Sequence, residues 1–166
     1  MTEVVELMER LKEKYSLDII PYASRQGEVV LKYYKLLRRV KETFPGYKVE
    51  RNANSPFLVA KLQMGEFDCF IIAPATANTV AKIAHGIADT LISNAAAQAM
   101  KVDIPVYIFP VDQEVGEVET ILPNGKKMKL RIREEDVRNV DTLRKMHGIT
   151  VLRTLEEIEE VVKSGR

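Results

Sequence analysis

Three polar side chains stand among alanines at residues 73–79, and their types and spacing indicate a ligand site. Thr76, Asn78 and Thr79 follow an apolar segment typical of a buried strand and precede small residues typical of a packed helix. Free backbone N–H groups and hydroxyls at a helix start favour an anionic or strongly polar ligand. The residues small enough to let a flat ligand approach the backbone are Ala73, Ala75 and Ala77. At the carboxyl end of a parallel strand, such a turn is typical of a nucleotide or flavin site.

The same three polar residues also have a purely structural interpretation. Threonine and asparagine are common at helix starts because their side chains bind free backbone N–H groups there. For the turn taken alone, this interpretation is the better one, so ligand binding needs support from the rest of the sequence.

Two further strand ends carry polar side chains. Ser24 ends an expected strand and Arg25 follows it, which offers a hydroxyl and a guanidinium to a phosphate. A helix cap followed by solvated side chains explains this pair almost as well. Asp112 and Gln113 follow the strand expected at 105–110, which brings them to the same edge of the sheet as the turn at 73–79.

The elements that must position these residues alternate between helix and strand. Hydrophobic periodicity and breaker residues predict helices at 1–15, 27–44, 54–64, 77 to about 100 with a bend at Gly86, 134–146 and 154–163. They predict strands at 17–23, 47–50, 67–73, 105–110 and 149–152. Residues 118–132 alternate on either side of Pro123-Asn124-Gly125, which predicts a hairpin. Thr154 and Glu157 are spaced as a capping box.

This alternation predicts an α/β fold with a doubly wound, mostly parallel sheet. Helices should cover both of its faces in a three-layer arrangement of the Rossmann or flavodoxin type, with the β-hairpin added. At 166 residues, 46% of them hydrophobic, the chain is long enough for one domain with a real core, which we expect to span 1–166.

Composition excludes several classes of function. A net charge of +1 argues against a general nucleic-acid binder. No apolar run approaches the length of a membrane span, and the cytoplasm is the expected location. The single cysteine, Cys69, lies in the middle of the strand expected at 67–73 and is expected to be a small buried side chain. One cysteine cannot form a disulfide framework or hold an iron–sulfur cluster by itself, so electrons would have to come from a partner.

The residues around the polar turn also carry a family resemblance. PATANT at 74–79, followed by KIAHGIADTL at 82–91, resembles the flavoprotein family that includes the homo-oligomeric flavin-containing cysteine decarboxylases. Within that family the chain is similar to the archaeal branch, the archaeoflavoproteins. The segments that carry this further similarity are Asn54-Ser55-Pro56-Phe57, Pro110-Val111-Asp112-Gln113 and ILPNGKKMKLRIR at 121–133. The resemblance covers roughly the whole chain.

The resemblance implies FMN as the cofactor. It implies that Ala75, Thr76, Ala77, Asn78 and Thr79 line the FMN site, with Asn78 closest to the reacting part of the ring. It also favours phosphate contact at Ser24, and less clearly at Arg25. With this support, the ligand-binding interpretation of the turn is preferred over a simple helix cap. The family further implies a homo-oligomer, a trimer or larger, with flavin near subunit boundaries and with the segments 86–97 and around Asn54 near an interface.

The chain departs from the decarboxylases at three places. Their Pro-Ala-Met-Asn segment, which handles substrate, here reads Pro110-Val111-Asp112-Gln113. Their catalytic histidine has no counterpart near Asn54, and His85 and His147 fall elsewhere with an expected structural or solvent-exposed role. No cysteine-bearing clasp over the substrate is evident. The cofactor half of the site is therefore expected to be kept and the decarboxylation half to be lost.

The expected function is that of an FMN-binding electron-transfer flavoprotein that accepts electrons from reduced ferredoxin and passes them to an unknown acceptor. Basic residues at 126, 127, 129, 131 and 133 could steer an acidic carrier, although a half-buried strand with a solvated face explains them as well. The alternatives are a dihydromethanopterin reductase, a phosphopantothenoylcysteine-type decarboxylase, disfavoured by the missing histidine, and a non-catalytic FMN carrier.

One feature of the element order is unusual for the predicted fold. The chain opens on a helix, whereas the family resemblance implies a first strand and a loop of Gly and Ser or Thr that holds the flavin phosphate. We therefore expect such a strand and loop to precede Met1.

Overall fold

The computed structural model describes residues 1–122 and 125–164. In this part of the chain the helices are α1 (Thr2–Tyr15), α2 (Arg25–Tyr33), α3 (Leu37–Thr43), α4 (Leu58–Gln63), α5 (Ala77–Ala84), α6 (Leu91–Lys101), α7 (Glu134–Arg144) and α8 (Glu156–Ser164). The strands are β1 (Tyr22–Ala23), β2 (Lys48–Val49), β3 (Phe70–Ala75), β4 (Val106–Pro110), β5 (Gly116–Ile121), β6 (Lys127–Ile132) and β7 (Ile149–Val151).

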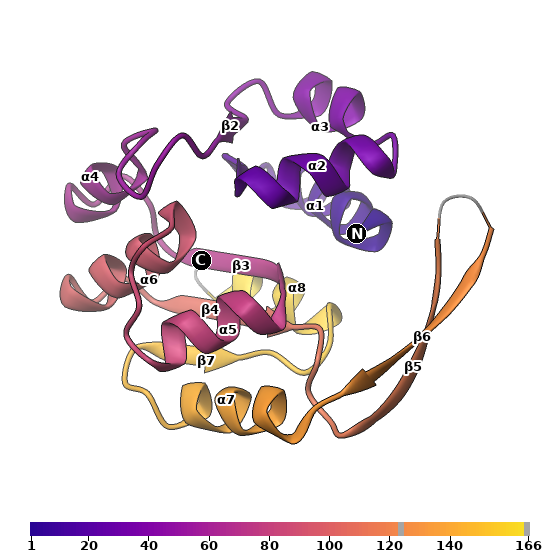
Figure 1. Ribbon diagram of the computed structural model, residues 1–166. Coiled ribbons are helices and arrows are strands. Elements are labelled where there is room, and N and C mark those ends of the chain that lie inside the picture. The colour runs from indigo at the N-terminus through magenta and orange to yellow at the C-terminus, as the bar shows by residue number, and fades with distance from the viewer. Residues whose placement is uncertain (123–124, 165–166) are drawn as a thin grey trace.

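The strands form parallel sheets and one hairpin (Figure 1). β4 lies between β3 and β7 and pairs with both in parallel. β1 pairs with β2 in parallel, and β5 pairs with β6 in an antiparallel hairpin. The predicted α/β class with a mostly parallel sheet is confirmed, although the parallel strands divide between two sheets where the sequence suggested one.

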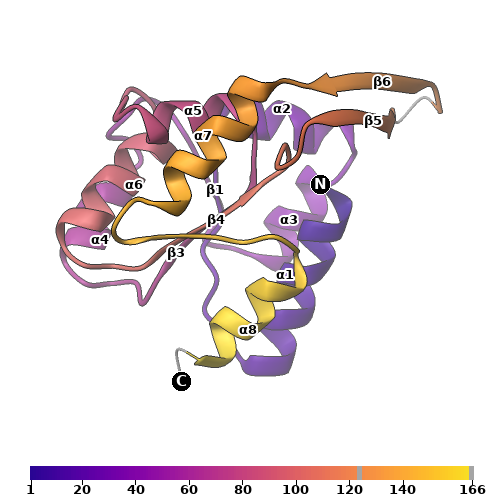
Figure 2. The ribbon, with the colours of Figure 1, turned by 90° about the horizontal axis from the view of Figure 1, so that it is seen from below.

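Helices cover both faces of the β3–β4–β7 sheet, as Figure 2 shows. Alternate residues of the strands point to opposite faces. Ile72, Val106 and Ile108 pack in one apolar cluster with residues of α4, α5, α6 and α7. Ile71 and Tyr107 pack instead against a cluster formed by α1 and α8. The predicted three-layer arrangement is therefore present around this sheet.

The helix predicted at 27–44 is two helices, α2 and α3. Lys35 takes a left-handed conformation (φ 58°) at the end of α2. The backbone N–H of Leu36 donates to the carbonyl of Leu31, and that of Lys35 donates to Lys32, which together form a Schellman motif. The break turns α3 so that Val40 joins Leu31 and Leu36 in one buried cluster. A lysine at this position gives no sequence signal for a helix end, since glycine usually fills it.

The helix predicted from 77 to about 100 is also broken, into α5 and α6. Gly86, where a bend was expected, has φ 69° and ends α5 in a second Schellman motif, in which Ile87 N–H donates to Lys82 O. Thr90 then starts α6 with a capping box, because its hydroxyl accepts from the backbone of Ser93 and Ser93 accepts from Thr90 N–H.

The remaining boundaries differ from prediction in one helix and in the strands. The helix predicted at 54–64 is the shorter α4, which begins at Leu58. β1 is shorter than the predicted 17–23, and β3 runs from residue 70 to residue 75, later than the predicted 67–73. Cys69 consequently lies just before β3 and not in its middle, and it is half-buried. α8 starts at Glu156, and Glu157 accepts from the backbone N–H of Arg153 where a capping box with Thr154 was expected. The predicted turn residues Pro123 and Asn124 lie outside the described residues.

Within residues 1–122 and 125–164, none of the helices has both the length and the apolar composition that crossing a membrane requires.

Candidate functional site

The turn from β3 into α5 places the predicted polar residues at the carboxyl edge of the three-stranded sheet. Ala75, the last residue of β3, is 1% exposed and stands opposite Pro110 of β4. Thr76 follows as the N-cap residue of α5. Thr76 and Asn78 are exposed and Thr79 is half-exposed. A buried strand thus delivers exposed polar side chains to one edge of the sheet.

The start of α5 keeps its hydrogen-bonding capacity for a ligand. The side chain of Thr76 makes no capping bond to the helix backbone. The first backbone hydrogen bond of the helix runs from Val80 N–H to Thr76 O. The N–H groups of residues 77–79 therefore have no acceptor within the helix. The hydroxyls of Thr76 and Thr79 lie 3.4 Å apart. The structural interpretation in which Thr76 caps its own helix is therefore not what the geometry shows, and the helix start offers donors to an anionic or polar group.

The end of β4 joins this edge directly. The backbone N–H of Val111 donates to Ala75 O over 3.0 Å, which brings the segment with Asp112 and Gln113 beside the α5 start. Gln113 is engaged within the chain: its amide nitrogen lies 3.1 Å from Pro110 O and 3.0 Å from Leu152 O. Its side-chain oxygen accepts from Arg144 over 3.4 Å. Gln113 thus ties the ends of β4 and β7 together.

Asp112 faces a charged pair at the start of α7. Arg133 donates to both carboxylate oxygens of Asp136, over 2.6 and 3.0 Å, and Asp136 is 6% exposed. Partial burial raises the pKa of Asp112, and the negative charge of Asp136 raises it further against the opposing effect of Arg133. Asp112 therefore holds its proton more strongly than an ordinary aspartate does.

Ser24 and Arg25 occupy the start of α2, at the end of β1. The hydroxyl of Ser24 accepts from Gly27 N–H over 2.9 Å, which is the helix cap that the sequence offered as an alternative. The same hydroxyl still carries a proton that it can donate. The guanidinium of Arg25 binds the backbone carbonyl of Arg51. Ser24 therefore bonds at the start of α2, and the Arg25 side chain bonds to the chain just after β2. Neither of these bonds is with the α5 turn.

Glu50 is a residue that sequence reasoning missed at this place. One carboxylate oxygen accepts from Arg25 N–H over 3.1 Å and the other accepts from Leu91 N–H over 2.9 Å. A single carboxylate thus serves the starts of both α2 and α6, where a negative charge is favourable. The only sequence signal was an acidic residue directly after a short strand. Its negative charge beside Ser24 disfavours a phosphate at the start of α2.

The sequence comparisons decide the family. A model of the family described as Flavoprotein matches residues 1–164. The chain belongs to the Flavoprotein family. This confirms the resemblance read from the sequence and the predicted class of cofactor, a flavin.

Relatives within the Flavoprotein family cover most of the chain. An uncharacterized protein of Methanocaldococcus jannaschii is 56% identical over 98% of this chain and 87% of its own length. A dihydromethanopterin reductase (acceptor) of the same organism is 39% identical over 78% of this chain, which spans only 57% of that reductase. The crystal structure of Burkholderia xenovorans DmrB in complex with FMN, described as a cubic protein cage for redox transfer, is 37% identical with a TM-score of 0.74. It aligns with 86% of this chain and 78% of its own chain.

The α5 turn of this Flavoprotein family member fits a flavin. Ala77 is partly exposed next to the buried Ala75, and its small side chain leaves the backbone open there. The donors of the helix start suit the carbonyl and nitrogen acceptors of a flavin ring or its phosphate. Which residue contacts which part of the cofactor remains a prediction for every residue named from the sequence.

The nucleophilic and metal-binding residue types lie outside this site. Burial raises the pKa of the Cys69 thiol, as expected of an inert side chain. His85 contacts Asn139 over 3.1 Å, between α5 and α7. Among the described residues there is no group of His, Cys, Asp or Glu side chains suited to a metal ion.

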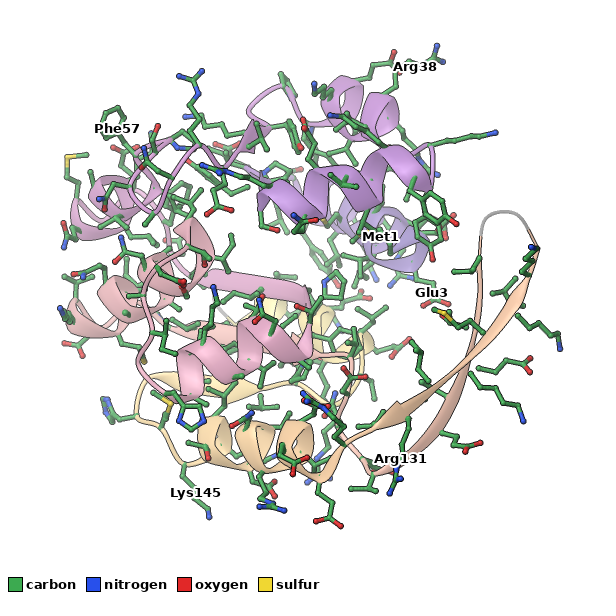
Figure 3. The ribbon with its side chains drawn as sticks, viewed as in Figure 1. Met1, Glu3, Arg38, Phe57, Arg131 and Lys145 are labelled. Carbon is green, nitrogen blue, oxygen red and sulfur yellow. The ribbon has the colours of Figure 1, made fainter. Side chains whose placement is uncertain are left out.

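A groove of about 540 Å³ runs along the other side of the sheet edge, between α1, the end of β4 and the start of α8. Its charged lining is mostly acidic: Glu3, Glu6 and Glu156 with Arg10. Glu3, near the start of α1, is labelled in Figure 3. This lining disfavours a phosphate, so the groove is a poor place for the cofactor's phosphate group.

Proposed function

We propose that this chain binds FMN and carries electrons from reduced ferredoxin to a second acceptor. The observation that carries the proposal is the α5 start, whose N-cap side chain leaves the helix donors free beside two alanines, in a member of the Flavoprotein family. The description of the DmrB structure, as a complex with FMN and a cage for redox transfer, supports the same function.

The proposed site assigns a role to each polar residue. Ala77 allows the flavin ring to approach the backbone, the buried Ala75 packs the turn that carries it, and the hydroxyls of Thr76 and Thr79 bind the polar edge of the ring. Asn78 lies nearest the reacting part of the ring. The bound flavin would supply the redox chemistry by taking up and releasing electrons. The chain's own residues bind and orient it, and Asp112 lies beside the site as a half-buried carboxyl whose pKa burial raises.

The phosphate end of FMN is proposed to bind at Ser24, with Arg25 as a second contact. Support comes from the proton that the Ser24 hydroxyl can still donate. Glu50 opposes this contact by its charge, and Arg25 must leave the carbonyl of Arg51 to take part. Gln113 is proposed to position the loop that carries Asp112, since its own polar atoms are already bonded within the chain.

The proposed active form is a homo-oligomer, a trimer or larger. DmrB is described as a cubic protein cage, which is a closed assembly of many copies. A closed assembly of this kind follows when the same contact repeats around rotation axes.

The visible spectrum of the purified protein, followed by FMN titration, tests the proposal. We expect one FMN per chain. Thr76→Val with Thr79→Val should weaken FMN binding by about tenfold, since a pair of lost hydrogen bonds contributes on the order of 1.4 kcal/mol. Thr150→Val, an exposed substitution of the same type on β7, is the control and should leave the affinity unchanged. Failure to bind FMN, both by this chain and by a version extended at its amino end, would contradict the proposal.

A second candidate function is dihydromethanopterin reduction. It is favoured by the reductase of Methanocaldococcus jannaschii that is 39% identical over 78% of this chain. That reductase is longer than this chain, which matches 57% of it. Turnover of dihydromethanopterin by the pure protein would decide for this candidate, and a bound flavin that no physiological reductant reduces would instead indicate a non-catalytic carrier.

A further inference from the structure

The β5–β6 hairpin reaches away from the rest of the chain in both views of the ribbon (Figures 1 and 2). Its strands pair from Gly116 opposite Ile132 to Ile121 opposite Lys127, and they pair with each other and not with the parallel sheets. Ile132 at the base is buried, whereas most of the other residues of the two strands are exposed. Most of the hairpin is therefore left uncovered by the described part of its own chain.

The two faces of the hairpin differ in character. Directly opposed residues of an antiparallel pair share a face. Val118 stands opposite Leu130 and Thr120 stands opposite Met128. These four residues, which we call the apolar face of the hairpin, carry no charge. Val118 is 40% exposed, Met128 is 38% exposed and Leu130 is 47% exposed, so three apolar side chains of one surface remain open to water.

The other face is mostly charged, with the exposed Ile121 opposite Lys127 at its far end. Glu117 stands opposite Arg131 and Glu119 stands opposite Lys129. Lys127 forms an ion pair of 2.8 Å with Glu119. Opposite charges across the strands stabilise a solvated face. The charged face thus accounts for the solubility of the hairpin, while the apolar face has no explanation within one chain.

We infer that the apolar face of the hairpin packs against a second copy of this chain. The inference rests on the proposed homo-oligomer. A surface without charge attracts neither an acidic electron carrier nor a nucleic acid, because both are bound through opposite charge. It matches another uncharged apolar surface, where burial of apolar area drives association.

A second copy offers such a surface at the two ends of α4. Phe57 is 74% exposed and Met64 is 67% exposed. Phe57 and Arg131 lie at opposite ends of the molecule in Figure 3, so the hairpin does not reach this surface within its own chain. A contact between two different surfaces is heterologous, and it closes into a ring when the rotation between copies allows. The hairpin face is small compared with the roughly 800 Å² that each partner of a stable interface buries. Several such contacts in one closed assembly would together bury the additional area that a stable assembly needs.

The test compares the two faces of the hairpin by solution mass. Val118→Thr with Leu130→Thr removes apolar area from the apolar face and keeps β-branched residues in the strands. Glu117→Thr with Arg131→Thr makes the matched change on the charged face. Light scattering at fixed micromolar concentration should give the wild-type mass for the charged-face variant, and half of that mass or less for the apolar-face variant. Far-UV circular dichroism checks folding, and Leu130→Thr alone replaces the double variant if the latter does not fold.

Several outcomes would overturn the inference. A monomeric wild type would overturn it. An apolar-face variant with unchanged mass would also overturn it. If that variant also bound FMN less tightly, the apolar face would cover a flavin of its own subunit and not a second copy. FMN titration of the same samples separates this result from the proposed function. A monomer that binds one FMN per chain contradicts the hairpin contact alone, and an assembled wild type that binds no FMN contradicts the cofactor alone.

Discussion

At the scale of single residues, the helix starts of this chain differ in whether their backbone N–H donors are bonded within the chain. At α2 and α6 the backbone donors are satisfied internally by the carboxylate of Glu50. At α5 the cap residue Thr76 makes no side-chain bond to the helix, and the donors stay available. The N-cap residues of α1, α3 and α4 also make no side-chain bond, so the proposed ligand site at α5 rests on its position at the sheet edge and on the polar residues of its turn as well as on its free donors.

Asp112 gives a prediction of pH dependence at the residue scale. Its pKa is raised in the folded chain, chiefly by burial. A carboxyl of this kind contributes stability at a pH below its unfolded pKa, and that contribution is lost as the pH rises through the folded pKa. Ionisation of Asp112 at higher pH places a half-buried negative charge near that of Asp136. Asp112→Asn should therefore raise the melting temperature at pH 7 and leave it nearly unchanged at pH 3.

Thermal unfolding at the two pH values checks this prediction. Asp18→Asn, at an exposed aspartate outside the helices and strands, is the control and should change the melting temperature at neither pH. An equal gain at both pH values would mean that the substitution acts by packing and not through the carboxyl charge.

The candidate site could be predicted as far as its chemistry is local. Thr76, Asn78 and Thr79 were recognised because the residues that make a helix start are adjacent in sequence. The contacts of Gln113 and Arg25 could not be predicted, because their partners come from distant segments. Gln113 bonds to Leu152 after β7, and Arg25 bonds to Arg51 after β2. Glu50 was missed for the same reason, since Leu91 lies far along the chain.

At the scale of elements, the break between α5 and α6 depends on one glycine. Gly86 has φ 69°, and a Cβ added there would meet no atom within 4 Å. Gly86→Ala should therefore destabilise the chain by about 1 kcal/mol through backbone conformation alone. Gly116→Ala in β5 also meets open space, but without a positive φ, and should be nearly neutral. Urea unfolding of both variants measures the difference. Equal stability of the two variants would show that the turn at Gly86 adapts without strain.

The fold could be predicted from sequence wherever a break carries a signal. Gly86 indicated a turn, and alternation with a turn motif indicated the hairpin. The end of α2 at Lys35 carried none, because lysine is a good helix former and its left-handed conformation is imposed by packing of Leu36 and Val40. The division of the parallel strands between two sheets was also missed.

At the scale of the whole molecule, a net charge of +1 hides an uneven distribution of charge. The hairpin strand β6 is basic, with Lys127, Lys129 and Arg131 on one face, while the groove beside α1 is acidic. Glu117 and Glu119 stand opposite two of these cations, so the positive field of the hairpin is weaker than the sequence of β6 alone suggests. Long-range steering of an acidic carrier depends on the charge that remains.

Charge reversal on the hairpin tests whether this remaining charge guides ferredoxin. Lys127→Glu with Lys129→Glu should slow reduction of the bound flavin by ferredoxin by about tenfold at low salt, because steered association depends on opposite charge. The difference should shrink at about 1 M salt, where the screening length falls to about 3 Å. Arg38→Glu with Lys145→Glu changes the net charge equally at sites that Figure 3 shows away from Arg131, and it should slow the reaction much less. Stopped-flow absorbance of the flavin measures both rates. If the two variants are slowed equally, net charge and not the hairpin sets the rate; if neither is slowed, the donor docks elsewhere or is not an acidic carrier.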